Sequence, residues 1–346
     1  MCIPIHSQRL STDEYVEGIL RGDRVVLARA ITLVESDLDS DGELASQVIE
    51  RCLPHAGQSL RVGITGAPGV GKSTFIESLG TYLTVDCKET VAVLSVDPSS
   101  AISGGSILGD KTRMERLAGD ERAFVRPSPA RGYLGGVARR TREAMLLCEA
   151  AGYRNILVET VGVGQSETSV RWMADFFLLL MPAGAGDELQ GMKRGIFEMS
   201  DLIAINKADG DNRQRAESTR REYENALHLF RAAADGWVPR VVTCSAFSRD
   251  ATIEIWHIVL QHRAQIQASG WFERHRRERA LEWMKDALLC GIEEELRRDT
   301  VVSEPLAAAQ RDVSEGRLSP FLAARQILAL LRGEERSNQV PSPFRT

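Results

Sequence analysis

The chain has 346 residues with 43 basic and 48 acidic side chains, which gives a net charge of −5. Dedicated nucleic-acid-binding proteins carry a basic surplus, so this balance argues against a nucleic-acid partner. Hydrophobic residues make up 43% of the chain, which is enough for a large core and excludes global disorder. The 6 cysteines lie far apart, without a CxxC pair, and are interpreted as reduced thiols rather than a disulfide frame or a zinc site.

The sequence shows no signal for secretion or membrane insertion. Its first residues lack the basic and then apolar pattern of a signal peptide. The longest apolar run, Phe176 to Met181, is far too short to span a bilayer. We therefore expect a cytoplasmic protein with no membrane partner.

The first predicted elements along the chain are helices. Apolar residues recur at helical spacing, as in Leu27, Ile31 and Val34. We predict an N-terminal helical extension over residues 1–56.

From residue 60 the pattern changes to short β-branched runs that alternate with helical stretches. This alternation predicts an α/β fold with a doubly wound, largely parallel sheet over residues 57–270. Right-handed crossovers place the loops that follow the strands along one edge of such a sheet. The predicted strands are Leu60–Thr65, Val91–Val96, Ala123–Arg126, Asn155–Glu159, Phe176–Met181, Leu202–Asn206 and Val241–Cys244.

Residues 271–346 return to helix and form a predicted C-terminal helical segment. The Trp271–Arg298 and Phe321–Leu331 stretches carry apolar stripes. Because a lone helix cannot bury its own stripe, we predict that this segment forms a homodimer. The charged Arg274–Arg279 run is interpreted as a solvated helix face.

A glycine-rich sequence follows the first predicted strand and fits GxxxxGK[ST]. Glycines at this spacing let backbone N–H groups surround phosphate oxygens, and the following helix N-terminus favours the negative charge. Lys72 is predicted to bridge the β- and γ-phosphates, and Ser73 to bind Mg²⁺. The alternative is a glycine-rich turn that matches by chance. The predicted phosphate-binding residues are Gly66, Ala67, Pro68, Gly69, Val70, Gly71, Lys72, Ser73 and Thr74.

An NKxD sequence at the end of another predicted strand indicates guanine as the base. Asp209 can accept two hydrogen bonds from N1–H and the exocyclic amine of guanine, a donor pair that adenine lacks. Asn206 and Lys207 are expected to brace the loop and pack on the base. Ser245 and Ala246, after the last strand, fit a supporting loop that contacts the guanine oxygen. Taken alone, either sequence could be an ordinary helix N-cap.

Acidic residues after two further strands are candidate ligands of Mg²⁺ or its waters. Glu159 ends its strand, and Asp97 and Asp110 lie in or beside a polar, glycine-rich segment. The alternatives are a solvated acid for Glu159 and helix caps for the two aspartates. Gly162 can sense a γ-phosphate through its N–H group. Val163 stands where signalling GTPases carry glutamine, so we expect slow intrinsic hydrolysis.

Taken together, these sequences resemble the MeaB/ArgK family of P-loop GTPases. The likeness covers roughly residues 10–335 and includes both helical extensions. The motifs that carry it are Gly66–Ser73, Ser95–Ser100, Glu159–Glu167, Gly184–Glu198 and Asn206–Asp209.

The resemblance implies a GTP-hydrolysing switch that serves an adenosylcobalamin-dependent acyl-CoA mutase of the methylmalonyl-CoA type. It implies GTP or GDP and Mg²⁺ as cofactors, and a homodimer whose GTP-dependent gate controls cofactor loading and protects the mutase. The segment Gly184–Phe197 resembles an additional switch of the family, with Lys193 as a coupling residue. The catalytic candidates are thus Lys72, Glu159 and Lys193.

Three other functions remain open at this point. A metallochaperone GTPase shares the same branch of the superfamily but normally shows a Cys/His cluster, which is not evident here. A kinase of a lysine, arginine and ornithine transport system is an older description of the same family. A nucleotide-gated binding module that barely turns over is the third.

Overall fold

The computed structural model describes residues 9–36, 38–96, 114–126, 134–160, 166–184, 194–227 and 235–332. The chain divides into two compact units, Met1–Leu281 and Glu282–Thr346, and each is described separately. No helix among these described residues is long and apolar enough to cross a membrane.

The first unit is built on a sheet of 7 strands in the order β3-β2-β4-β1-β5-β6-β7, and every neighbouring pair is parallel. The predicted α/β architecture is therefore confirmed, and every predicted strand is present within one residue at either end. The central strands are buried along almost their whole length, as expected for a sheet covered on both faces. The strands are β1 Leu60–Gly66, β2 Val91–Val96, β3 Ala123–Arg126, β4 Asn155–Thr160, β5 Phe176–Pro182, β6 Leu202–Asn206 and β7 Arg240–Thr243.

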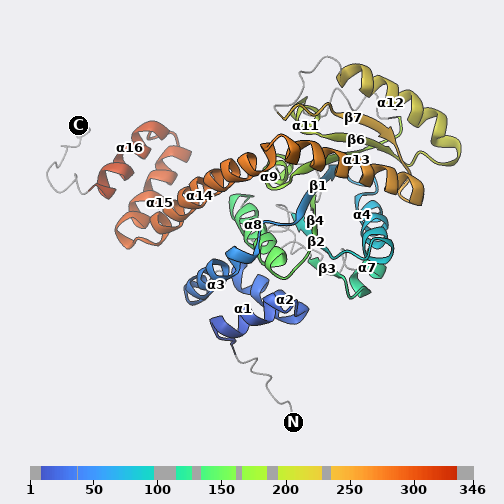
Figure 1. The fold of residues 1–346 in the computed structure, drawn as a ribbon. Coiled ribbons are helices and arrows are strands. Elements are labelled where there is room, and N and C mark those ends of the chain that lie inside the picture. Colours follow the sequence, from blue (N-terminus) through green and yellow to red (C-terminus); the bar gives the residue numbers. More distant parts are fainter. Residues whose placement is uncertain are drawn as a thin grey trace, which may run out of the picture. The chain divides into compact units, whose positions relative to one another are not determined.

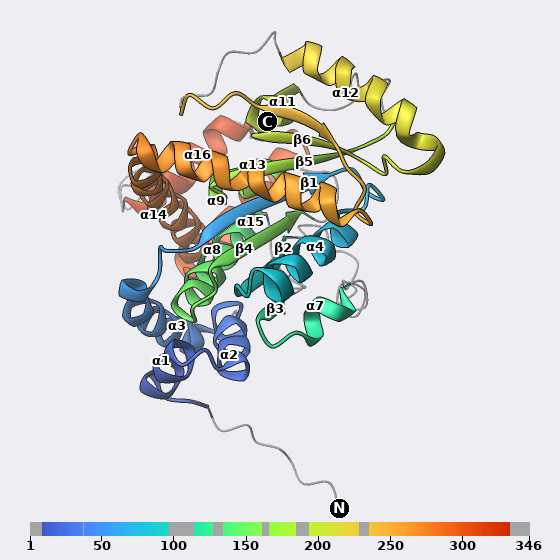
Figure 2. The ribbon, with the colours of Figure 1, turned by 45° about the vertical axis from the view of Figure 1, so that its right-hand side comes forward.

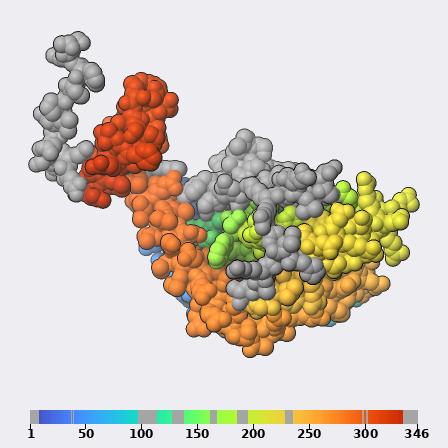
Figure 3. Space-filling model, turned by 90° about the horizontal axis from the view of Figure 1, so that it is seen from above, coloured from blue at the N-terminus to red at the C-terminus, as the bar shows by residue number. Residues whose placement is uncertain are grey.

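Helices cover both faces of this sheet (Figure 1). One apolar core joins the sheet to α4 (Lys72–Thr81), α7 (Glu115–Gly119) and α13 (Arg249–Ala268). The other face carries α8 Leu134–Ala150, α9 Ser166–Met173, α11 Arg194–Met199 and α12 Arg213–Leu227. Figure 3 shows this unit from above, with the outer surfaces of α12 in yellow and α13 in orange.

The helix predicted to run on from the glycine-rich sequence ends differently from a regular α-helix. After Thr81 the backbone widens into a π-helical turn over Tyr82–Asp86.

Three short helices precede the sheet: α1 Thr12–Leu20, α2 Arg24–Val34 and α3 Asp39–Cys52. A further 3-10 turn, Leu53–His55, leads to β1. The hydroxyl of Ser11 caps the first of these helices in a reciprocal pair with Glu14, and Asp23 caps the second. The three helices pack against one another and against α8, so the predicted N-terminal helices are present (Figure 2).

The helix α14 (Trp271–Arg298) starts in the first unit and continues into the second. The second unit also contains α15 (Thr300–Ser314) and α16 (Pro320–Leu331), which pack together. The apolar pattern predicted no separate element at α15. Pro305 lies inside this helix, and an interior proline weakens any helical prediction.

Candidate functional site

The glycine-rich loop follows β1 and folds back on itself before α4. Two of its glycines are required by close approaches. A Cβ on Gly66 would lie 2.3 Å from the carbonyl oxygen of Leu180, and a Cβ on Gly71 would lie 2.8 Å from Nδ2 of Asn206. Gly71 also has a φ of 98°, in the left-handed region that favours glycine. The tight curl that phosphate binding needs is therefore built into the backbone.

Lys72 begins α4 and turns its side chain back over the loop. Its Nζ donates to the carbonyl oxygens of Gly66 at 2.7 Å and Ala67 at 3.2 Å. The lysine is buried in spite of its charge. The ammonium group is thus held within the loop that would surround a phosphate, beside the positive end of a helix dipole.

The next residue, Ser73, contacts the acid at the end of β4. Its hydroxyl donates to Oε1 of Glu159 at 3.2 Å, and the Glu159 side chain is buried. Parallel pairing of β1 with β4, in which Ile64 lies opposite Glu159, brings the two oxygens together. A hydroxyl and a carboxylate are oxygen donors of the kind that Mg²⁺ prefers, so the pair fits such an ion.

Asn206, at the end of β6, joins the glycine-rich loop to the loops predicted to hold the base. Its Nδ2 donates to the carbonyl oxygen of Val70 at 2.8 Å. Its Oδ1 accepts from the backbone N–H of Ala246 at 3.1 Å. One buried side chain therefore fixes both ends of the site relative to each other.

The two base-side loops also contact each other directly. The hydroxyl of Ser245 donates to the carboxylate of Asp209, and the N–H of Ala208 donates to the carbonyl of Cys244 at 3.0 Å. Asp209 and Lys207 are exposed, and Lys207 has a φ of 60°. The carboxylate is thus accessible at the rim, with a hydroxyl as its partner.

Four predicted site residues lie outside the described residues: Asp97, Asp110, Gly162 and Lys193. The described ones gather at the carboxyl edge of the sheet, after β1, β4, β6 and β7, where open parallel sheets bind ligands.

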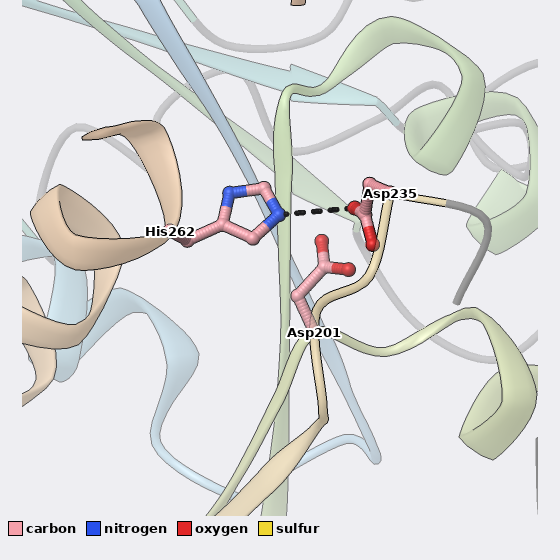
Figure 4. A group of neighbouring side chains, drawn as sticks. All are labelled: Asp201, Asp235 and His262. Carbon is pink, nitrogen blue, oxygen red and sulfur yellow. Dashed lines mark hydrogen bonds and ion pairs between the residues drawn. The ribbon is translucent and has the colours of Figure 1, made fainter. Parts of the chain in front are cut away.

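A second polar cluster lies away from this edge and was not found in the sequence (Figure 4). Asp201, Asp235 and His262 are buried, and one possible ligand atom of each lies within 4.8 Å of the others. The guanidinium of Arg171, however, donates to both oxygens of Asp201 at 3.0 and 3.3 Å. This cation already stands where a metal ion would act, so we interpret the cluster as a buried ion network.

The electrostatics of this cluster fit that interpretation. Burial alone would raise the pKa of Asp235, but hydrogen bonds with His262 and the Trp237 N–H group, together with the charges of His262 and Arg171, hold that pKa below its usual value. Nε2 of His262 lies 3.4 Å from Oδ2 of Asp235. No local motif joins these residues, which explains why no sequence pattern indicated them.

A third network lies at the amino edge of the sheet and corrects one interpretation. The Arg274–Arg279 run is not simply a solvated face, because Arg276 and Arg279 are largely buried. Both guanidinium groups donate to Asp175, Arg276 from Nε to Oδ1 at 3.1 Å and Arg279 from Nη1 at 3.2 Å. Burial would raise the pKa of Asp175, but the arginines lower it to about 2. Nearby, Arg61 holds Glu149 in a bidentate pair at 2.8 and 2.9 Å.

The strand, glycine-rich loop and helix, with the acid of the neighbouring strand, define a P-loop nucleotide-binding protein. A family model described as "Methylmalonyl Co-A mutase-associated GTPase MeaB" matches residues 27–300. The chain is 46% identical to "GTPase ArgK" of Escherichia coli K12, over 91% of this chain and 95% of that protein. It is 44% identical to "Methylmalonic aciduria type A homolog, mitochondrial" of Mus musculus, over 91% of this chain and 78% of that protein.

Among solved structures, one described as "Crystal structure of LAO/AO transport system kinase" is 37% identical. It superimposes with a TM-score of 0.73 and covers 96% of this chain and 100% of that one. The chain belongs to the MeaB family of GTPases, and its enzymatic activity is that of a GTPase.

Proposed function

We propose that GTP binds along the carboxyl edge of the sheet. In this arrangement the glycine-rich loop and Lys72 hold the phosphates, and Ser73 and Glu159 hold Mg²⁺ directly or through water. The base lies against the loops of Asp209 and Ser245. The ion would supply positive charge that stabilises the phosphate group being transferred. The bond between Asn206 and the loop at Val70 supports the proposal, because it sets one distance between the phosphate and base subsites.

The proposed role of this GTPase is to chaperone an adenosylcobalamin-dependent acyl-CoA mutase in the cytoplasm. Nucleotide state would gate loading of the cofactor and protect or reactivate the mutase. The observation that carries this proposal is the family itself, whose description names methylmalonyl-CoA mutase and whose model spans residues 27–300.

A single-turnover hydrolysis assay tests the chaperone role. Adding an adenosylcobalamin-dependent methylmalonyl-CoA mutase is expected to accelerate GTP hydrolysis. Lys193→Ala is expected to lose much of that acceleration and to keep the nucleotide affinity, because the residue is proposed to couple rather than to bind. Arg221→Ala, which removes an exposed cation from α12, serves as the matched control. An unchanged rate with the mutase would reject the chaperone role, and a wild-type response of Lys193→Ala would reject only the coupling residue.

A kinase of an amino-acid transport system is a second candidate, favoured by the name of the solved relative. The two functions differ in where the γ-phosphate goes. We expect radiolabel from γ-labelled GTP to appear only as inorganic phosphate. Stable label on a lysine/arginine/ornithine-binding protein would favour the kinase.

We also propose a homodimer formed through the second unit. Its part of α14 exposes Met284, Leu288, Leu289 and Ile292, and α16 exposes Phe321. Met284, Leu288 and Ile292 recur every four residues and so lie along one face of the helix, and an exposed apolar face is typical of an association site. Light scattering is expected to give twice the chain mass for the wild type and a monomer for Leu288→Glu. A wild-type monomer at micromolar concentration would contradict the proposal.

A further inference from the structure

Phe247 is the most exposed large hydrophobic side chain in the part of the chain that the structure describes, at 87% of its full exposure. It lies between β7 and α13, directly after Ser245 and Ala246. An aromatic ring left in water gains no burial energy in the nucleotide-free chain. Its position beside the proposed base subsite therefore needs an explanation.

The backbone around this ring is well fixed. The N–H of Ser248 donates to the carbonyl of Ser245 at 2.8 Å and closes a turn in which Phe247 is one of the two central residues. The N–H of Phe247 itself donates to the hydroxyl oxygen of Ser245 at 3.3 Å. Ser248 then caps α13 through Ala251. The ring is thus presented on a short, hydrogen-bonded turn.

The same turn is tied to the residue proposed to recognise guanine. The hydroxyl of Ser245 accepts from Phe247 and donates to the carboxylate of Asp209. The N–H of Ala246 is bonded to Asn206, in the other base loop. The backbone N–H of Phe247 is therefore linked to the carboxylate of Asp209 through a single hydroxyl group.

We propose that the ring of Phe247 packs against the purine base of the bound guanine nucleotide. This inference rests on the proposed base subsite and adds a second kind of contact to it. Asp209 would bind the polar edge of the base, which leaves its flat apolar surfaces to be covered. Aromatic side chains stack on any base, because every base has a π-face. Phe247 would then supply affinity without choosing among purines, whereas Asp209 would supply the choice.

A docking surface for another protein is the competing explanation of an exposed phenylalanine. The backbone link to Asp209 favours the nucleotide, since it holds the turn that carries Phe247 beside the loop proposed to recognise the base. The two explanations differ in what a change of the ring does to nucleotide binding in the isolated protein.

The test compares the dissociation constants of GDP and inosine diphosphate, whose base lacks the exocyclic amine. Phe247→Ala is expected to raise both dissociation constants by about tenfold, which corresponds to about 1.4 kcal/mol, and to leave the ratio of the two constants unchanged. Val25→Ala truncates an exposed apolar side chain on α2, at 69% of its full exposure, and is expected to bind as the wild type does. Phe247→Trp should keep the affinity, and its indole fluorescence should change when GDP binds.

Three outcomes would overturn the inference. Wild-type affinity of Phe247→Ala would assign the ring to a partner instead. A change in the ratio of the two affinities would show that the ring only supports Asp209. Weak binding by a normally folded Phe247→Trp without a fluorescence change would also exclude stacking. Asp209→Asn tests the proposed base subsite apart from the role of Phe247. If this variant still preferred GDP over inosine diphosphate as the wild type does, the base subsite itself would be rejected.

Discussion

The acidic residues at the two edges of the sheet have different kinds of partners. At the carboxyl edge, Glu159 accepts a hydrogen bond from Ser73, and Asp209 accepts one from Ser245. At the amino edge, Asp175 and Glu149 are held by arginines with bonds from two or more nitrogens.

This difference separates acids that can contact a ligand from acids that stabilise the fold. A hydroxyl partner can turn toward another acceptor when a metal ion or a base arrives, and no buried charge is left alone. An arginine paired to a buried carboxylate cannot leave without such a cost. We therefore infer that Asp175 and Glu149, whose partners include arginines, hold the fold, and that Glu159 and Asp209 are the candidates for contact with a ligand. Substitutions at the two edges can break or sharpen this separation.

The largest effect is expected at the amino edge. Asp175→Asn would leave Arg276 and Arg279 buried without their carboxylate, and breaking such a pair costs about 3–5 kcal/mol. Urea unfolding measures the loss in the free energy of unfolding. Asp86→Asn removes a partner of the exposed Arg249 and should change the free energy of unfolding by less than about 1 kcal/mol. Equal effects of the two variants would remove the distinction between the edges.

The next effect is expected in catalysis. Lys72→Ala should lower GTP turnover by about 10²–10³-fold, the usual cost of removing one charge-stabilising donor. The melting curve without nucleotide should stay cooperative and move little, because the ammonium group bonds to carbonyls of the loop rather than packing in the apolar core. Hydrolysis at the wild-type rate would rule out the phosphate role.

A smaller effect is expected for recognition of the base. Asp209→Asn should weaken GTP binding by about 1–3 kcal/mol, the scale of polar groups that lose their partners. Titration calorimetry with GTP and ATP gives both affinities. Equal binding of the two nucleotides by the wild type would remove the basis for guanine recognition.

The smallest effect concerns pH and the start of α14. Burial and the nearby Arg279 lower the pKa of His275 to about 4, although Glu278 opposes the shift and Arg171 adds to it. Because the folded pKa lies below the unfolded one, this contribution is complete above about pH 6.5 and is lost as pH falls toward 4. With solvent screening we expect a loss of about 1 kcal/mol. Urea unfolding measured between about pH 4 and pH 7 checks this, and His275→Gln should flatten the dependence of stability on pH.

The sequence was sufficient to predict which site residues lie together wherever a motif is local and directly follows a strand. The glycine-rich loop, the end of β4 and the two base loops each follow a strand, and parallel pairing brings such ends to one edge. Their contact through Asn206 agrees with the brace expected of that residue. The nucleotide roles of these residues remain predictions.

The sequence was insufficient where partners are far apart along the chain. Asp175 meets Arg276 across 101 positions, and a run of mostly basic residues gives no sign of which side chains turn inward. The Asp201, Asp235 and His262 cluster is spread in the same way, over three separate segments. Only tertiary packing decides such pairs.

The arginine pairs at Asp175 also determine where the chain can be shortened. Arg276 donates from Nη1 to the carbonyl of Gly57 at 2.6 Å as well as to Asp175, so the first turns of α14 fasten the segment that enters β1. A chain that stops at residue 270 would lose both arginines and leave a buried carboxylate uncovered. A chain that stops at Leu281, where the first unit ends, keeps them. The later stop allows the GTPase to be studied apart from the apolar helices without damaging its sheet.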